Sequence, residues 1–223
     1  MNNLLAFWRS TAGKKVVMGA TGLVMIAWIV LHMLGNLQAF GGAAKLDAYA
    51  AILQGPAHEL VLAVRALLLF CLALHVVAAV QLTLLDRAAR PDAYARKVPQ
   101  AATPASMTLR IGGVLLLAFI ILHLMHFTSG QLHPSFIEGE VFRNLVIGLR
   151  VPAVALGYLV AMAALGFHLF HGAWASLRSL GAVRPRPNPL HRPIARALAI
   201  VVWFGFSIIP VAVQLGWLTL PGE

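Results

Sequence analysis

Four histidines stand within long apolar stretches of the sequence, one in each of four successive stretches. They are His32, His75, His123 and His168. A neutral imidazole is the commonest protein ligand for metals, and an ionisable side chain inside a membrane is costly and usually functional. A hydrogen bond to a neighbouring helix explains one such residue well. Four of them, one per stretch, favour a shared role as metal ligands.

The apolar stretches predict five transmembrane helices. The chain has 223 residues, of which 60% are hydrophobic and 11% charged, whereas ordinary soluble domains have roughly 25% charged residues. Each stretch has at least the roughly 20 residues that cross about 30 Å of hydrocarbon as a helix. We therefore expect one all-α integral membrane domain over residues 1–223, with four helices in a bundle and a peripheral fifth. The expected spans are about 16–40, 60–85, 109–130, 150–177 and 196–217.

The lysines and arginines predict the orientation of these spans. Thirteen of the 17 lie before the first span, between the second and third, or between the fourth and fifth; the others are Lys45, Arg65, Arg143 and Arg150. The positive-inside rule then places the N-terminus in the cytoplasm and the C-terminus outside. The net charge of +10 therefore forms a basic cytoplasmic face, suited to anionic lipid or an acidic partner subunit rather than nucleic acid.

The distances of the histidines from the cytoplasmic charges divide them into two levels. At 1.5 Å per residue, His75 and His168 lie roughly 15–18 Å from that boundary, and His32 and His123 roughly 20–26 Å. In an up–down bundle the first and third helices are diagonal, as are the second and fourth. Each level thus offers two facing imidazoles, which can take both axial positions of one metal–porphyrin. A bare zinc ion would need about four ligands at one level.

Other classes of site are excluded by the composition. Cys71 is the only cysteine, which excludes a disulfide framework, a cysteine-ligated iron–sulfur cluster and covalent haem attachment. The sequence contains no glycine-rich phosphate loop, dinucleotide fingerprint or nucleophile elbow, and no loop is long enough to form a catalytic domain. Chemistry on a soluble substrate is therefore expected on another polypeptide.

Two of the histidines belong to doublets spaced three residues apart, which are His123/His126 and His168/His171. Residues at this spacing share a helical face, so geometry alone permits either member as the ligand. A weak internal repeat favours the first member, because Gly35 and Ala78 stand three residues after the other two histidines. This leaves His126 and His171 for hydrogen bonds to a propionate, a quinone or a neighbouring helix. Close approach of a porphyrin or ordinary helix packing would each explain Gly35, Gly166 and Gly172.

Five segments carry a resemblance to a known family: "STAGKKVVMGATGLVMIAWIVLHMLGNLQAF", "LHVVAAVQL", "RAARPDAYARKVPQAAT", "ILHLMHFTSG" and "FHLFHGAWASLRSLG". They resemble the diheme cytochrome b membrane-anchor subunit of succinate dehydrogenase and quinol:fumarate reductase, of the single-subunit, five-helix type. The likeness covers nearly the whole chain. It implies two haems b, the outer ligated by His32 and His123 and the inner by His75 and His168, and selects His168 over His171.

The resemblance also implies partners and a location. The family's anchor lies in the bacterial cytoplasmic membrane, binds a flavoprotein and an iron–sulfur subunit on its cytoplasmic face, and exchanges electrons with a quinone, usually menaquinone. Bis-histidine ligation leaves no open site on the iron, so such haems transfer electrons. One departure stands out: the apolar runs contain no Asp or Glu, so a carboxylate proton path through the bundle, present in some relatives, is unsupported. Higher oligomers of the complex remain open.

Three residues outside the four histidines have two interpretations each. Arg178 would pair with a propionate of the inner haem or act as a positive-inside anchor. His58 and Glu59 would handle quinone protons or simply begin a solvated helix. Two alternative functions remain open as well. One is the cytochrome b anchor of another quinone-linked enzyme, such as a hydrogenase or formate dehydrogenase; the other is a haem-free transporter or structural anchor.

Overall fold

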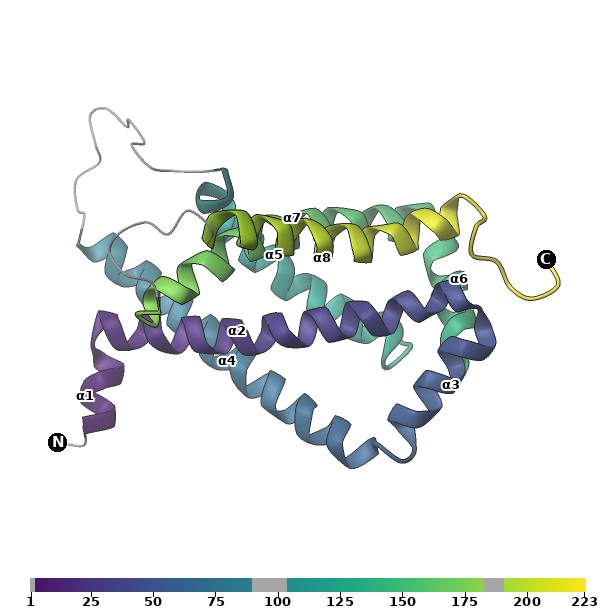
Figure 1. The fold of residues 1–223 in the computed structure, drawn as a ribbon, viewed down its shortest axis with the longest axis horizontal. Coiled ribbons are helices and arrows are strands. Elements are labelled where there is room, and N and C mark those ends of the chain that lie inside the picture. The colour runs from purple at the N-terminus through teal and green to yellow at the C-terminus, as the bar shows by residue number, and fades with distance from the viewer. Residues whose placement is uncertain (1–2, 90–103, 183–190) are drawn as a thin grey trace.

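The computed structural model describes residues 3–89, 104–182 and 191–223, and in these ranges every regular element is a helix. Figure 1 shows the long helices running side by side, with the N- and C-termini at opposite ends of the molecule. Their bounds are α1 Asn3–Arg9, α2 Thr11–Asn36, η1 Leu37–Gly41, α3 Ala43–Gln54, α4 His58–Ala88, α5 Pro104–Phe127, α6 Val141–Arg150, α7 Pro152–Ser179 and α8 His191–Gln214.

Five of the described helices are long and apolar enough to cross a membrane, as predicted, which marks the chain as a multi-pass membrane protein. The candidate spans are Thr11–Gly41, His58–Ala88, Thr108–Phe127, Pro152–Ser179 and Arg192–Gln214. The third and fifth helices end three residues earlier than predicted, at Phe127 and Gln214. Turns follow in both cases, with Gly130 (φ 71°) and Gly216 (φ 72°) in the left-handed region that glycine adopts at low cost.

The first span begins earlier than predicted because a cap interrupts the amphipathic N-terminal segment. The hydroxyl of Ser10 accepts a hydrogen bond from the backbone N–H of Gly13 at 2.9 Å, which starts α2 at Thr11. The Lys14 ammonium donates to the carbonyl oxygens of Trp8 and Arg9 at 2.8 and 2.9 Å, and so satisfies the last turn of α1. Helix α1 is consequently a separate element that bends away from α2 (Figure 1).

Helix α8 packs extensively along α7 and less extensively along α2. The expectation that the fifth span is peripheral to the other four stays a prediction. Small residues explain the close packing: Ala199 and Ala212 of α8 are buried, and a Cβ at Gly205 would collide with the side chain of buried Met33 on α2. Small residues at an interface let membrane helices approach closely.

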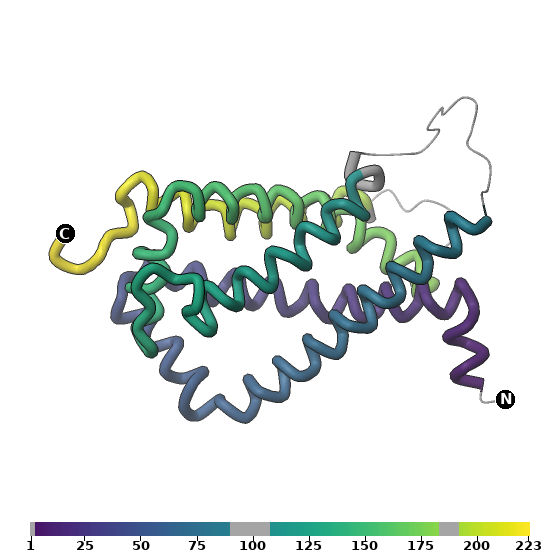
Figure 2. Tube along the Cα trace, turned by 180° about the vertical axis from the view of Figure 1, so that it is seen from behind, coloured from purple at the N-terminus to yellow at the C-terminus, as the bar shows by residue number. Residues whose placement is uncertain are grey.

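Helices α4 and α5 are held more loosely. Helix α4 packs mainly along α2, and α5 mainly along α7. Figure 2 shows the two as separate rods that diverge toward the α3 end of the molecule. Where side chains are described, α4 buries only Cys71 and Ala78, and α5 only His126. The apolar faces of both helices are therefore left for lipid or for another apolar group.

The end of the bundle that carries the C-terminus is closed by α3 and α6, two shorter helices that lie between the candidate spans. Helix α6 was not predicted, although its apolar residues recur every three or four positions, as in an amphipathic helix. Its buried apolar residues are Phe142, Leu145, Val146 and Leu149. They join residues of η1, α3 and α8 in one apolar core at this end.

A carboxylate from α3 caps the start of α6. Asp47 Oδ1 accepts a hydrogen bond from the backbone N–H of Phe142 at 2.8 Å, while the N-cap residue Glu140 makes no capping hydrogen bond itself. We expect Asp47→Ala to destabilise the protein by about 1 kcal/mol, because a first-turn N–H loses its acceptor. The thermal midpoint of the full chain in detergent measures this. Asp47→Asn keeps an acceptor and should stay close to wild type; an equal loss in both variants would contradict the capping role.

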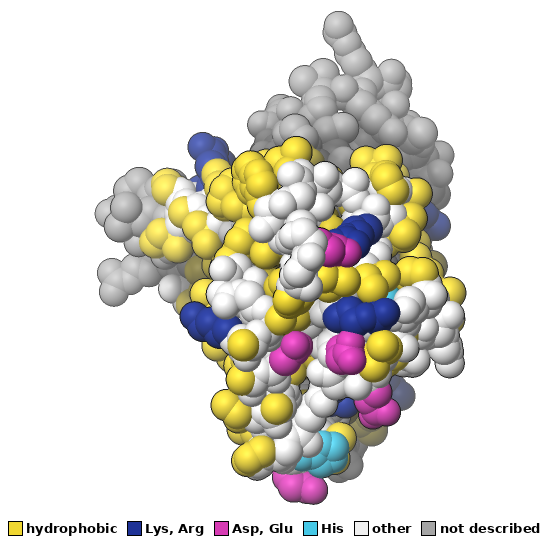
Figure 3. Space-filling view, turned by 90° about the vertical axis from the view of Figure 1, so that its right-hand side faces the viewer, with side chains coloured by type: hydrophobic (Ala, Val, Ile, Leu, Met, Phe, Trp, Pro, Cys, Tyr) yellow, Lys and Arg dark blue, Asp and Glu magenta, His cyan; other side chains and the backbone are white. Residues whose placement is uncertain are grey.

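The two ends of the bundle differ in charge. Helix α1, the end of α4 and the starts of α5 and α8 lie at one end, whereas α3, α6 and the C-terminus lie at the other (Figure 1). Figure 3 views the latter end, where acidic and basic side chains are interspersed. There Arg150 and Glu223 form an ion pair, and the hydrogen bond from Arg150 lowers the pKa of the Glu223 carboxyl. This tether to the C-terminus persists until the pH falls through that lowered pKa.

Candidate functional site

The four predicted histidines meet as two facing pairs, each joining diagonal helices. The ring centroids of His32 on α2 and His123 on α5 lie 5.9 Å apart, with an interplanar angle of 79°. Those of His75 on α4 and His168 on α7 lie 6.2 Å apart, at 57°. The first member of each doublet is the one that faces the opposite helix. All four side chains are half-buried, so the protein alone does not enclose them.

The inner pair, His75 and His168, has one ring fixed by the backbone of α2. Nδ1 of His75 lies 3.0 Å from the carbonyl oxygen of Met18. A carbonyl only accepts, so Nδ1 carries the proton and Nε2 keeps its lone pair. Nδ1 of His168 is buried with no hydrogen-bond partner in the protein. Buried polar atoms normally have one, so this unused capacity is typical of a side chain that contacts a bound group.

Small residues surround the inner pair. A Cβ at Gly22 of α2 would lie 3.4 Å from Cε1 of His75, and a Cβ at Gly113 of α5 would lie 3.8 Å from Cε1 of His168. The hydroxyl of Thr21 donates to the carbonyl of Val17 at 2.8 Å and lies 3.4 Å from Nδ1 of His75. The two glycines leave space beside the imidazole rings of His75 and His168, and the Thr21 hydroxyl adds a polar contact to His75.

The outer pair, His32 and His123, lies among aromatic side chains. Trp28 stacks on His32 with centroids 5.9 Å apart, and Phe206 of α8 lies 5.8 Å from the same ring. Phe119 stacks on His123 at 5.7 Å. The Asn36 amide donates to the backbone carbonyl of His32 at 2.8 Å and lies within 3.4 Å of both of its ring nitrogens. Apolar surroundings of this kind keep both imidazoles neutral.

The separation of the two pairs along the membrane normal follows from α2. His75 of the inner pair contacts α2 at Met18 and Thr21. His32 of the outer pair is itself a residue of α2. Eleven residues from Thr21 to His32 correspond to about 16 Å at 1.5 Å per residue. The structure therefore places the pairs at two distinct levels, in the order that the sequence predicts.

The spacing within each pair suits a metal held from opposite sides. Two imidazoles that share one metal ion in this way have centroids about 6 Å apart, since each metal–nitrogen bond is about 2 Å and each centroid lies about 1 Å behind its nitrogen. No described hydrogen bond joins the two rings of either pair. Among the described residues, no three His, Cys, Asp or Glu side chains gather as a metal site. Two imidazoles per level suit a metal whose remaining ligands come from a macrocycle.

The second members of the doublets have other neighbours. His126 is buried, and its Nδ1 lies 3.0 Å from the hydroxyl of Tyr158. The ring of His171 meets Trp174 edge to face at 6.3 Å. Neither ring faces another histidine on the opposite side of the bundle. Of the three roles considered from the sequence, contact with a neighbouring helix is the one that the described structure contains for His126.

Arg178 lies in the last turn of α7, where it contacts an indole. Its guanidinium carbon lies 4.8 Å from the centre of the Trp174 ring, and that of Arg192 on α8 lies 4.8 Å from the same ring. This arrangement links α7 to α8 through cation–π contacts. His58 and Glu59 lie in the first turn of α4, far along the chain from either histidine pair.

The glycines singled out in the sequence have separate roles. A Cβ at Gly35 would lie 2.8 Å from the hydroxyl of Tyr49, and one at Gly166 would lie 3.4 Å from Cβ of Trp203. Gly35 and Gly166 thus admit neighbouring side chains. Gly172 has nothing within 4 Å of its Cβ position, so the described structure gives no packing reason for a glycine there.

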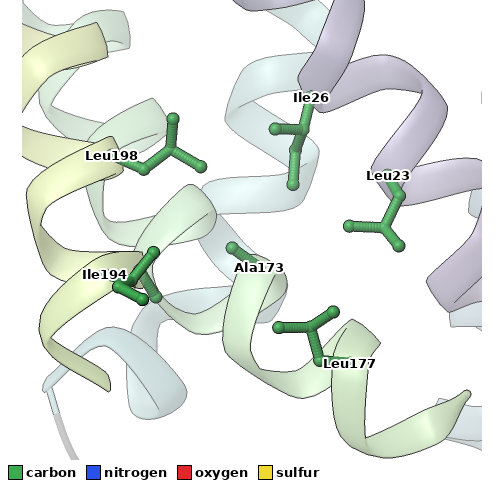
Figure 4. Close-up of a pocket in the computed structure, with 7 residues that line it drawn as sticks. Leu23, Ile26, Ala173, Leu177, Ile194 and Leu198 are labelled. Atoms are coloured by element: carbon green, nitrogen blue, oxygen red, sulfur yellow. The ribbon is translucent and has the colours of Figure 1, made fainter. Parts of the chain in front are cut away.

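A cavity of about 170 Å³ opens away from the histidine pairs, between the first half of α2, the second half of α7 and the start of α8 (Figure 4). Its lining carries no ionisable side chain, so it offers dispersion contacts alone. The lining residues are Leu23, Ile26, Ala173, Leu177, Ile194, Ala195 and Leu198. The histidine pairs remain the only described constellation with ligand chemistry inside the spans.

Sequence reasoning missed two partners of the histidines. The carbonyl of Met18 is a backbone group and leaves no signal in the sequence. Tyr158 is one of three tyrosines in the chain and stands inside an apolar stretch, where its hydroxyl needs a partner. That isolated hydroxyl is the signal that could have pointed to it.

Comparison with known proteins gives no match: no protein-family model, curated protein or solved structure is similar to this chain.

Proposed function

We propose that the chain is the membrane anchor and electron-transfer subunit of a succinate:quinone oxidoreductase, acting as succinate dehydrogenase or fumarate reductase. The observation that carries this proposal is the two facing histidine pairs, with centroids 5.9 and 6.2 Å apart on diagonal helices. Their spacing supports one haem b in each pair. The motif resemblance then supports the choice of enzyme.

The residues of the chain would hold the two groups by neutral imidazoles. His75 and His168 would hold the inner haem, and His32 and His123 the outer. Bound haem would supply a one-electron redox couple. The loosely packed α4 and α5 each contribute one ligand, and α2 and α7 contribute the others, so a macrocycle would occupy the middle of the bundle. Arg178 remains a candidate partner for an inner propionate, although its contact with Trp174 is sufficient reason for its position.

The proposed docking face for the soluble subunits is the end of the bundle that carries α1, the end of α4 and the starts of α5 and α8. Arg9, Lys14, Lys15, Arg87 and Arg110 belong to these segments and to the start of α2, and make this end basic. On this proposal a flavoprotein and an iron–sulfur subunit bind there, on the cytoplasmic side of the bacterial membrane, and menaquinone or another quinone is the redox partner within the membrane. Complementary charge would steer and orient the docking subunit. Anionic lipid would contact the remaining basic side chains.

Purification of the complex from membranes tests the function. We expect the flavoprotein and iron–sulfur subunits to co-purify, and the dithionite-reduced minus oxidised spectrum to show haem b. A pyridine haemochromogen assay should count one haem for each facing pair. A well-folded complex that contains its soluble partners but no haem would contradict the role of the histidines. Hydrogenase or formate dehydrogenase subunits in place of the expected partners would support the alternative enzyme.

A further inference from the structure

We propose that Tyr158 is a positioning residue for the outer histidine pair: its hydroxyl bridges His123 and His126 and fixes which nitrogen of His123 faces His32. The inference rests on the proposed function, since it concerns a ligand of the outer haem. It assigns a role to Tyr158 and to the second histidine of the doublet, neither of which the facing pairs explain.

The bridge is formed by one side chain of α7 and two of α5. The Tyr158 hydroxyl lies 3.3 Å from Nδ1 of His123 and 3.0 Å from Nδ1 of His126. The position of the tyrosine ring is also restrained, because Phe119 and Phe127 pack edge to face against it with ring centroids 5.0 and 5.7 Å away. A half-buried hydroxyl in an apolar bundle has few other partners. The three polar groups therefore form a short hydrogen-bonded chain. It ends at His126, whose Nε2 is buried without a hydrogen-bond partner in the protein.

The inner pair provides a comparison. There, Nδ1 of His75 donates to the Met18 carbonyl, and this bond leaves Nε2 free as the ligand atom. A hydrogen bond to the second ring nitrogen sets the tautomer and raises the basicity of a metal-bound imidazole. At the outer pair the Tyr158 hydroxyl stands where the backbone carbonyl stands at the inner pair. The contact of His75 with a backbone carbonyl cannot be removed by a side-chain substitution, whereas the contact of His123 with the Tyr158 hydroxyl can.

A hydroxyl both donates and accepts, so its direction must be set by a further group. If His123 binds iron through Nε2, its Nδ1 carries a proton and donates to the Tyr158 oxygen. Tyr158 must then donate to an acceptor, and Nδ1 of His126 is the nearest described one. The acceptor on His126 thus makes Tyr158 the donor of that hydrogen bond. The Tyr158 oxygen is then left to accept the hydrogen bond from Nδ1–H of His123.

The position of His126 is itself fixed by α6 and by His133, which precedes this helix. The rings of His126 and His133 are tilted against each other by 30°, with centroids 5.1 Å apart. Nε2 of His133 donates to the Asn144 carbonyl of α6 at 2.8 Å. Gly148 of α6 lies directly over both rings, because a Cβ there would be 2.8 Å from Nε2 of His126. The acceptor of the Tyr158 hydroxyl is therefore held in place by α6.

A redox titration of the complex carrying Tyr158→Phe tests the proposal. Loss of the acceptor makes His123 a weaker electron donor, which disfavours oxidised iron. We expect one haem to be more readily reduced, by up to about tenfold in its reduced-to-oxidised ratio at a fixed potential, or about 59 mV for a one-electron couple. The other haem should not change. The low-spin electron paramagnetic resonance signal of the same haem should shift as its imidazole reorients.

Three further variants make the test specific. His126→Leu removes the acceptor and should shift the same haem, whereas His126→Asn places an amide oxygen near the former Nδ1 and should restore wild-type behaviour. Thr21→Val, beside the inner pair, should leave the outer haem unchanged. Equal shifts of both haems, or no shift in Tyr158→Phe and His126→Leu, would overturn the positioning role while leaving the proposed function intact. A wild-type complex without haem would overturn both.

Discussion

His168→Ala is expected to halve the haem content of the purified complex, with the outer haem retained. On the proposed function, the substitution removes one of the two imidazoles that would hold the inner haem, whose rings lie 6.2 Å apart across the bundle. Succinate-to-quinone electron transfer should fall by at least about 100-fold, since removal of a direct ligand exceeds the 10- to 100-fold effect of changing its hydrogen-bond partners. The pyridine haemochromogen assay and quinone-linked turnover of the same preparation measure both effects.

His171→Ala is the matched control for that experiment, because it removes an imidazole one helical turn away on the same helix. Its ring contacts Trp174 rather than a facing histidine, so haem content should stay at the wild-type value. His75→Ala should reproduce the loss seen with His168→Ala. Full haem content in both inner-pair variants would reject the assignment, and loss in His171→Ala alone would move the ligand to the second member of the doublet.

Gly148→Ala is expected to destabilise the protein by overpacking two buried imidazole rings. The added Cβ would lie 2.8 Å from Cε1 and Nε2 of His126 and 2.9 Å from Nε2 of His133. Neither ring can easily move away, because a hydrogen bond with Tyr158 restrains His126 and one to the Asn144 carbonyl restrains His133. Overpacking of this kind costs about 1–3 kcal/mol. The thermal midpoint of the full complex in detergent should fall accordingly.

Gly157→Ala on α7 is the control for Gly148→Ala. Nothing lies within 4 Å of its Cβ position, so the added methyl enters open space and alanine is the better helix former. Its midpoint should equal or slightly exceed that of wild type. A decrease as large as that of Gly148→Ala would show that the effect comes from glycine replacement in general and not from the contact with His126.

The sequence predicted those parts of the fold that depend on length and hydropathy. Five spans follow from apolar runs because a bilayer imposes a minimum length on each helix. The pairing of His32 with His123, and of His75 with His168, follows from counting residues along helices of known rise. Their neighbours could not be predicted in this way, since the Met18 carbonyl and the Tyr158 hydroxyl act through three-dimensional packing.

The helix that was not predicted has a physical explanation. Helix α6 is amphipathic and only ten residues long, so its residues follow the helical period without reaching the length of a span. The neighbours of α8 depend on where Ala199, Gly205 and Ala212 meet other helices. Small residues mark a close contact but do not say which helix supplies the other half. Hydropathy therefore predicted the number of candidate spans and not how they pack.

The unequal packing of the helices has a consequence for biosynthesis. Helices α2, α7 and α8 pack on one another through side chains of the chain itself, so this trio is expected to assemble as soon as α8 enters the bilayer. Helices α4 and α5 each pack mainly along one member of the trio, and few of their described side chains are buried. On the proposed function, they are the parts of a newly made chain that can still swing outward. Insertion of the prosthetic groups would then be the event that completes maturation, with entry from the lipid between α4 and α5.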